Sequence, residues 1–233
     1  MAAASRIEFE LANGAQVFCV FLTDGGSRIS PAVRNAESLA VLTTIGVPAA
    51  NVAFIGSEAS IPDGKLVEHL AIAFDRLNER MRGIEVERVY CLAWEGGHHD
   101  HDASQLVAAA FANVRGVLAR TYEMPLYRGM GRLFRVAAPF DVESWTRRKL
   151  TFRDGYRLSM LAWRYHSQRS TWIGLFPETF IKFAVFRREL TRQIKPARFH
   201  TRPHYGMLFY ERRFKFPYER FVQFAAPFIA SHL

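Results

Sequence analysis

The feature that most constrains the fold of this chain is the alternation of short apolar segments with helical repeats in its first half. Continuous runs of β-forming residues lie at 15–22, 52–55 and 88–94. Such runs are typical of strands buried on both faces, as in a parallel sheet. Apolar residues then recur at helical spacing, and the predicted helices cover 31–45, 65–82 and 102–120. The order predicts an α/β fold with a largely parallel sheet.

The pattern changes after Tyr122. A strand is expected at 133–137, and helices are expected at 143–168 and 177–193. From about residue 196 the chain is basic, aromatic and broken by four prolines. We therefore divide the chain into an α/β core, residues 1–125, and a C-terminal part, residues 126–233, which completes the domain and ends in a basic, aromatic-rich elaboration.

Charge is distributed unevenly between the two halves. Residues 1–110 hold 8 Lys and Arg against 14 Asp and Glu, whereas residues 111–233 hold 23 against 8. Fifteen of the 20 phenylalanines also lie in the second segment. Any anionic partner, either nucleic acid or an anionic membrane, should therefore be sought at the C-terminal part. The other interpretation is a set of solvated basic faces over an aromatic core. In that core we expect the tail to pack through Phe209, Phe214, Phe216, Phe221 and Phe224.

The cysteines and the hydropathy pattern indicate the compartment. Cys19 and Cys91 lie in apolar runs and are predicted to be buried strand thiols, which excludes a disulfide framework and a cysteine zinc site. The N-terminus has no apolar segment of signal-peptide length. No run approaches the roughly 18–20 apolar residues of a membrane span, so no transmembrane segment is expected. We expect a cytoplasmic protein.

A histidine-rich segment is the sharpest chemical feature. The sequence Gly96-Gly-His-His-Asp-His101 follows a predicted buried strand and precedes a predicted helix. Ligands bind at this carboxyl edge of open α/β sheets, and the amides at the start of the helix add a positive dipole. Imidazole is a common zinc ligand, and a nearby carboxylate fixes its tautomer. A polar surface loop is the alternative interpretation.

Two weaker signals lie nearer the N-terminus. Asp24 stands beside Gly25 at the end of the first predicted strand, which suits an active-site carboxylate and equally a turn. Arg34 and Glu37 lie one turn apart on the following helix. An exposed ion pair between them is the simpler interpretation.

Together these residues resemble the PIG-L/LmbE family of zinc-dependent N-acetylglucosaminyl deacetylases. The similar segments are Thr23-Asp-Gly25, Arg34-x-x-Glu37, Pro62-Asp-Gly64, Gly97-His-x-Asp-His101 and Tyr165-x-Ser-Gln168. The resemblance covers roughly residues 10–180. It implies a Rossmann-like sheet with helices on both faces, one catalytic zinc, and hydrolysis of an N-acyl group from an amino sugar or sugar conjugate.

The resemblance also implies roles for single residues. His101 matches a zinc ligand, and His98 matches the histidine that protonates the leaving amine or steadies the oxyanion. Asp100 matches the carboxylate that orients a histidine. Arg34, with Asp24 near it, matches the substrate side. His99 stands where the family allows a proline, so its replacement is expected to have little effect.

One family motif is missing. The His-Pro-Asp-Asp motif, which supplies two zinc ligands and the general base, should precede Thr23 by about 25–30 residues, and only 22 residues precede Thr23 here. The first strand therefore also looks absent, and residues 2–14 look like the helix that follows it. A catalytic zinc normally needs three protein ligands. We expect weak zinc binding and little hydrolysis in this form. An upstream start, a decayed gene and a non-catalytic use of the fold, as a scaffold or a binding protein, all stay open.

Overall fold

The computed structural model describes residues 3–26, 29–126, 145–169, 173 and 187–233. Within them the chain is mixed α/β with two small sheets. The first sheet pairs β1 with β2 in parallel, and the second has the order β3-β4-β6-β5. In the second sheet β3 and β4 run parallel, whereas β6 is antiparallel to both of its neighbours. The strands are β1 (Cys19–Val20), β2 (Val52–Ala53), β3 (Val89–Leu92), β4 (Thr121–Met124), β5 (Thr146–Lys149) and β6 (Arg188–Gln193).

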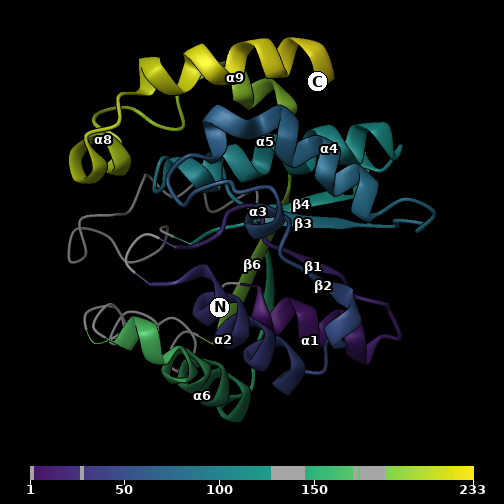
Figure 1. Ribbon diagram of the computed structural model, residues 1–233. Coiled ribbons are helices and arrows are strands. Elements are labelled where there is room, and N and C mark those ends of the chain that lie inside the picture. Colours follow the sequence, from purple (N-terminus) through teal and green to yellow (C-terminus); the bar gives the residue numbers. More distant parts are fainter. Residues whose placement is uncertain (1–2, 27–28, 127–144, 170–172, 174–186) are drawn as a thin grey trace.

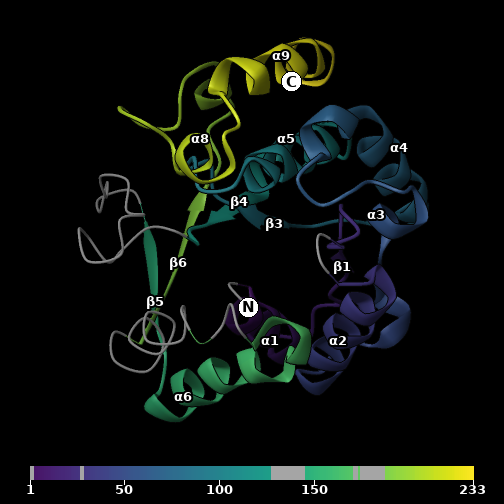
Figure 2. The same ribbon diagram turned by 60° about the vertical axis from the view of Figure 1, so that its left-hand side comes forward.

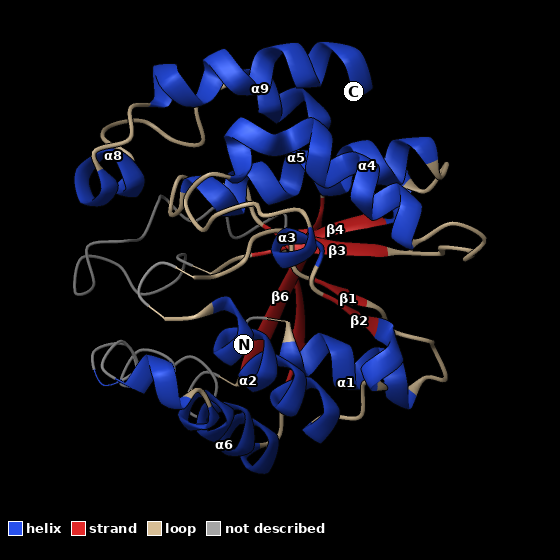
Figure 3. Ribbon diagram, in the orientation of Figure 1, coloured by secondary structure: helices blue, strands red, loops and turns tan. Residues whose placement is uncertain are grey.

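Helices lie on both sides of the strands (Figures 1 and 3). On one side are α4 (Leu70–Arg80), α5 (His99–Val114) and, packed on α5, the C-terminal α9 (Tyr218–His232). On the other side are α1 (Ala4–Ala12), α2 (Pro31–Thr44) and α6 (Phe152–Leu161). Shorter helices are α3 (Ile55–Glu58) and α8 (Phe209–Phe214). Short 3-10 turns occupy 49–51, 66–69, 118–120, 162–164, 166–168 and 196–200.

Two apolar clusters correspond to these two sides. The larger one joins α4, α5 and β3 to side chains of the C-terminal segment, including Leu208, Phe221 and Phe228. The smaller one joins α1, α2 and α6 through side chains such as Leu42 and Leu158. Since α9 contributes to the larger cluster, the C-terminal segment is part of the main core.

Several predicted elements are confirmed. The helix expected over 31–45 is α2, which begins at Pro31, a residue suited to a first helical position because its nitrogen has no hydrogen to leave unpaired. That helix ends before Gly46, whose φ of +96° favours glycine. Parallel pairing of β1 with β2 and of β3 with β4 is also as expected.

Other predictions are wrong. Residues 146–149 and 188–193, assigned to helices from their spacing, form β5 and β6, which lie side by side at one edge of the molecule (Figure 2). Pairing of β6 between β4 and β5 outweighs a helical preference that is small per residue. Because β6 runs antiparallel to both β4 and β5, the second sheet is mixed. The prediction of a mostly parallel sheet therefore holds only in part. The strand expected at 133–137 lies outside the described residues.

Burial also differs from expectation in places. Strand pairing around β1 covers just two residues, and Cys19 is half-buried, whereas Cys91 is buried as predicted. In the tail, Phe216 and Phe221 are buried. Phe214 and Phe224, however, keep 43% and 39% of their surface exposed and so contribute less to the core than expected. No helix in the described part of the chain is both long and apolar enough to cross a membrane.

Candidate functional site

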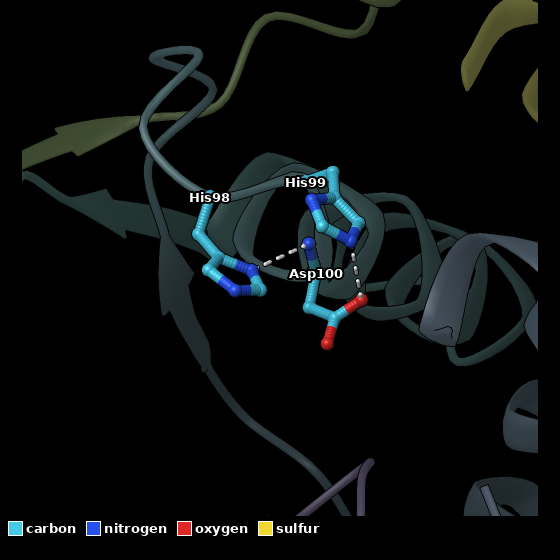
Figure 4. A group of neighbouring side chains, drawn as sticks. All are labelled: His98, His99 and Asp100. Atoms are coloured by element: carbon cyan, nitrogen blue, oxygen red, sulfur yellow. Dashed lines mark hydrogen bonds and ion pairs between the residues drawn. The ribbon is translucent and has the colours of Figure 1, made fainter. Parts of the chain in front are cut away.

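The histidine-rich segment forms the junction between β3 and α5. It was expected to be a loop up to His101, but α5 begins at His99, and His98 is the residue that caps it. The Nδ1 atom of His98 accepts a hydrogen bond from the backbone N–H of Asp100 at 3.1 Å (Figure 4). In the neutral ring the proton is therefore on Nε2. Burial, followed by the charges of His101 and His99, lowers the pKa of His98 to about 3.

His99 lies flat against the tail. Its ring stacks on Phe216 with the centroids 4.4 Å apart and the planes 8° apart. Its Nε2 atom donates to the carbonyl of Gly64 at 2.8 Å, so the neutral ring carries no proton on Nδ1. Burial lowers the pKa of His99. These contacts give His99 a structural role that the sequence did not indicate.

Asp100 fastens the first turn of α5 to the segment after Pro62. One carboxylate oxygen accepts from the backbone N–H of Gly64 at 2.5 Å, and the other accepts from Leu66 at 3.0 Å. The nearest histidine nitrogen is Nε2 of His99, 3.9 Å from Oδ1 (Figure 4). The resemblance gives Asp100 the task of orienting a histidine, but in this structure its short contacts are to the backbone. Burial raises the pKa of Asp100 to about 7 despite these two bonds.

Asp102 fixes the other end of the junction. Its carboxylate, fully buried, accepts from the backbone N–H groups of Glu95 at 3.1 Å and of Gly96 at 3.2 Å. Burial raises its pKa well above the usual value. Gly96 has a φ of +69°, and a Cβ there would lie 2.7 Å from Leu208. Glycine is therefore required, and the segment is held at a defined position before α5.

The donor atoms near His98 do not fit a tight zinc site as they stand. Ligand atoms of His98, His99 and Asp100 all lie within 4.8 Å of one another. However, both oxygens of Asp100, Nε2 of His99 and Nδ1 of His98 already make hydrogen bonds to the backbone. The histidine expected to bind zinc, His101, is not in this group, although its ring lies 5.2 Å from that of His98. Nε2 of His98 carries the ring proton, so Nδ1 of His99 is the one ring nitrogen of the group with a free lone pair, fewer than the three ligands a catalytic zinc needs.

A second part of the site follows β1 and β2. Asp24 ends the β1 segment, and its Oδ1 atom accepts from the N–H groups of Gly26 and Asp63, both at 2.9 Å. Its own N–H donates to Ile61 at 2.8 Å. Asp24 therefore joins the end of the β1 segment to the Pro62–Gly64 turn, to which Asp100 is also bound.

Asp63 links the two parts electrostatically. Burial raises the pKa of Asp63, and the negative charge of Asp24 raises it further. The charges of Arg34 and His99 act in the opposite direction. The Arg34 guanidinium lies over the backbone of Gly25, since its Nε atom is 3.6 Å from the position of a Cβ at that glycine. Its Nη1 atom is buried and has no hydrogen-bond partner among the described residues.

Glu37 binds the segment that follows α6. Its carboxylate accepts from the N–H of Ser167 at 2.8 Å and from the Ser167 hydroxyl at 2.6 Å. Slight burial raises the pKa of Glu37, but the Ser167 hydrogen bonds and the charge of Arg34 outweigh it and lower the pKa overall. Tyr165, two residues earlier, hydrogen-bonds Ser38 on α2. The segments 34–37 and 165–168, which the sequence analysis treated separately, thus lie together. No ion pair joins Arg34 to Glu37 among these described residues, so the exposed ion pair expected between them is wrong.

Sequence reasoning missed three contributors to this site. Phe214 packs edge-on against His98 at 4.6 Å, and Phe216 covers His99. Neither is close in sequence to the histidines. The alternation of aromatic with basic residues in the tail was the only sequence feature that marked these two phenylalanines. Asp102 was missed as well, because an acidic residue in a first helical turn usually faces solvent.

Three comparisons were made between this chain and known proteins. No family model matches it. No curated protein and no solved structure matches it either.

Proposed function

We propose that this chain is a PIG-L-type protein that acts on an N-acylated amino sugar or sugar conjugate, with hydrolysis of the N-acyl group as its reaction. One observation carries the proposal. Asp24 accepts a hydrogen bond from the N–H of Asp63, and Asp100 accepts from the N–H groups of Gly64 and Leu66. Residues that follow β1, β2 and β3 therefore meet at one segment, Asp63–Leu66. α/β folds bind ligands at the carboxyl ends of their parallel strands, where such polar groups converge.

Arg34 is the group we assign to substrate binding. A guanidinium has five N–H donors in a planar fork, which suits sugar hydroxyls and phosphate oxygens. The buried Nη1 of Arg34 lacks a hydrogen-bond partner in the described part of the chain, and leaving such a donor unpaired costs about 1–3 kcal/mol. A ligand oxygen at this position would remove that cost. Asp24 lies beside it and shapes the turn that faces the ligand.

His98 is the group we assign to the reacting carbonyl. Because its Nδ1 atom accepts from the Asp100 backbone, the Nε2–H of the neutral ring is the donor it can offer. A neutral imidazole donor suits stabilisation of an oxyanion, the second of the two roles that the resemblance implies. Protonation of the leaving amine by His98 would require a ring that is charged, which its buried position disfavours.

Zinc binding is expected only from the resemblance. When bound, the metal would activate water and polarise the acyl carbonyl. Of the residues expected at such an ion, the described part of the chain offers His101, which does not complete the ligand set by itself. Sugar binding and hydrolysis are therefore separate claims. For the compartment we propose the cytoplasm, on the two unpaired thiols, Cys19 and Cys91.

The test measures binding and hydrolysis in parallel. Calorimetry with an N-acetylglucosamine conjugate should show binding that Arg34→Gln weakens by about tenfold or more, the value of one well-made charged hydrogen bond. Arg76→Gln, at an exposed arginine of α4, is the matched control and should leave binding unchanged. Acetate release in the presence of zinc tests hydrolysis. Binding without acetate release would support the sugar assignment and refute hydrolysis by this form. Absence of binding would refute the proposal.

If acetate is released, three alanine variants assign the roles. His101→Ala should abolish the activity, whereas His98→Ala should reduce kcat by about 10²–10⁴-fold. His99→Ala was expected from the sequence to have little effect. The contacts of His99 with Gly64 and Phe216 instead lead us to expect reduced stability with sugar affinity retained by the folded fraction. Equal loss in all three variants would mean that the junction had collapsed and that these roles are wrong.

A further inference from the structure

The chain from Arg202 to Lys215, here called the α8 segment, carries the two most exposed large apolar side chains of the described residues. Tyr205 is 99% exposed and Met207 is 70% exposed. Gly206 stands between them with a φ of +84°, so a turn brings both to its tip. Exposed apolar side chains that lie singly need no explanation, but two at one turn indicate a contact surface.

The base of this turn is firmly held. Leu208, next to Met207, is fully buried, and its N–H donates to Glu211 at 2.6 Å. The N–H of Phe209 donates to the carbonyl of Gly96 at 2.9 Å. Arg202 forms an ion pair with Glu211 and donates to the carbonyl of Gly206 at 3.3 Å. The apolar tip therefore projects from an ordered base.

Cations follow the tip in the sequence. Arg212, Arg213 and Lys215 are all exposed, and the only acidic residue of the α8 segment, Glu211, is bound to Arg202. Phe214, 43% exposed, lies between two of these cations, with the Arg213 guanidinium 5.8 Å from its ring. An apolar tip next to a basic flank matches an anionic membrane surface, where tyrosine occupies the interface and Lys or Arg binds lipid headgroups.

We propose that the α8 segment binds the surface of an anionic lipid bilayer, with Tyr205 and Met207 entering the interface and Arg213 and Lys215 contacting headgroups. A nucleic acid fits these residues less well. Single-stranded binding uses aromatic rings on which bases stack. Of the two tip side chains one is methionine, and the Phe214 ring already contacts His98 and Arg213. The proposal does not depend on the proposed reaction, since it uses the surface alone.

Sedimentation of the full chain with vesicles tests the proposal. Vesicles of phosphatidylcholine with about 30% phosphatidylserine should bind the protein at low salt, and binding should weaken as salt is raised. Replacing both tip residues (Tyr205→Ser with Met207→Ser) should weaken binding about tenfold or more, because a buried methionine side chain alone is worth that factor. Arg213→Gln with Lys215→Gln should weaken it by about thirtyfold.

Matched controls remove similar groups elsewhere. Val114→Ser replaces a side chain that is 63% exposed at the end of α5, and Arg76→Gln with Arg82→Gln removes two exposed charges near α4. Both should bind vesicles as the wild type does. Since Tyr205 and Met207 make little contact with the protein, the tip variant should keep the wild-type unfolding midpoint. A Tyr205→Trp variant should be quenched by brominated lipids.

Three results would overturn the proposal. One is absence of binding to phosphatidylserine vesicles at low salt. A second is a tip variant that binds as tightly as the wild type, or a tryptophan at 205 that brominated lipids do not quench. The third is a single-stranded RNA that binds more tightly than vesicles and loses affinity in the tip variant, which would make the surface one for nucleic acid.

Discussion

Replacing Phe221 by alanine tests whether the C-terminal helix is part of the core. Phe221 is 1% exposed and lies edge-on to Trp94 with the ring centroids 5.6 Å apart. It also stacks with Tyr210 at 6.2 Å and with Tyr218 at 6.3 Å. A Phe→Ala change at such a position usually costs about 3–5 kcal/mol, from lost transfer energy and the cavity left behind. Total stabilities are about 5–15 kcal/mol, so the variant should be severely destabilised.

Phe224 on the same helix provides the matched control. It is 39% exposed, so Phe224→Ala removes a similar side chain with much less burial and should cost below about 1.5 kcal/mol. Urea unfolding followed by circular dichroism measures both variants, with the slope of the transition as a check on two-state behaviour. Equal losses in the two variants, or a loss below about 1 kcal/mol for Phe221→Ala, would refute the packing of α9 described above.

Three further predictions concern the site. After dialysis the protein should retain well under one zinc per chain, and His101→Ala should lower even that; one tightly held zinc by metal analysis would show that the ligand set is complete after all. The lowered pKa of Glu37 means that its ionised form stabilises the folded state at pH values above its unfolded pKa, near 4.5, and that this contribution is lost as the pH falls through the folded pKa. Glu37→Gln should therefore flatten the decline of the urea midpoint below about pH 4.5, and an unchanged decline would exclude the Ser167 contact from that role. Gly56→Ala would place a Cβ 2.3 Å from the Thr23 backbone, so it should cost at least about 1–3 kcal/mol, and a neutral effect on the melting temperature would contradict the close approach of α3 to the segment after β1.

Elements with local causes could be predicted from the sequence. Helix α2 has its proline at the start, its glycine after the end and its apolar residues at helical spacing. Residues that follow β1, β2 and β3 also come together, although these strands belong to two different sheets. Asp24, Asp63 and Asp100 illustrate this, since all three meet at a single turn.

Elements with distant causes could not be predicted. Residues 188–193 read as the end of a helix, but they form a strand because Arg192 pairs with Glu123 on the neighbouring β4, which is 69 positions away in sequence. The contacts of His98 and His99 with Phe214 and Phe216 are likewise non-local. Residue spacing carries no information on such partners. It predicted the residues of the junction but not the side chains that cover them.

The buried carboxylate of Glu123 has a consequence for the order in which the chain becomes stable during synthesis. It accepts from Trp94, Gln105 and Arg192, and Arg198 approaches it at 3.2 Å. Trp94 and Gln105 precede Glu123 in the sequence. Arg192 and Arg198 follow it by 69 and 75 positions, so they are synthesised much later. A ribosome-bound chain that ends before Arg192 would hold a buried charge without its cation, which is strongly unfavourable. The N-terminal half should therefore stay open to chaperones until Arg192 and Arg198 have been translated.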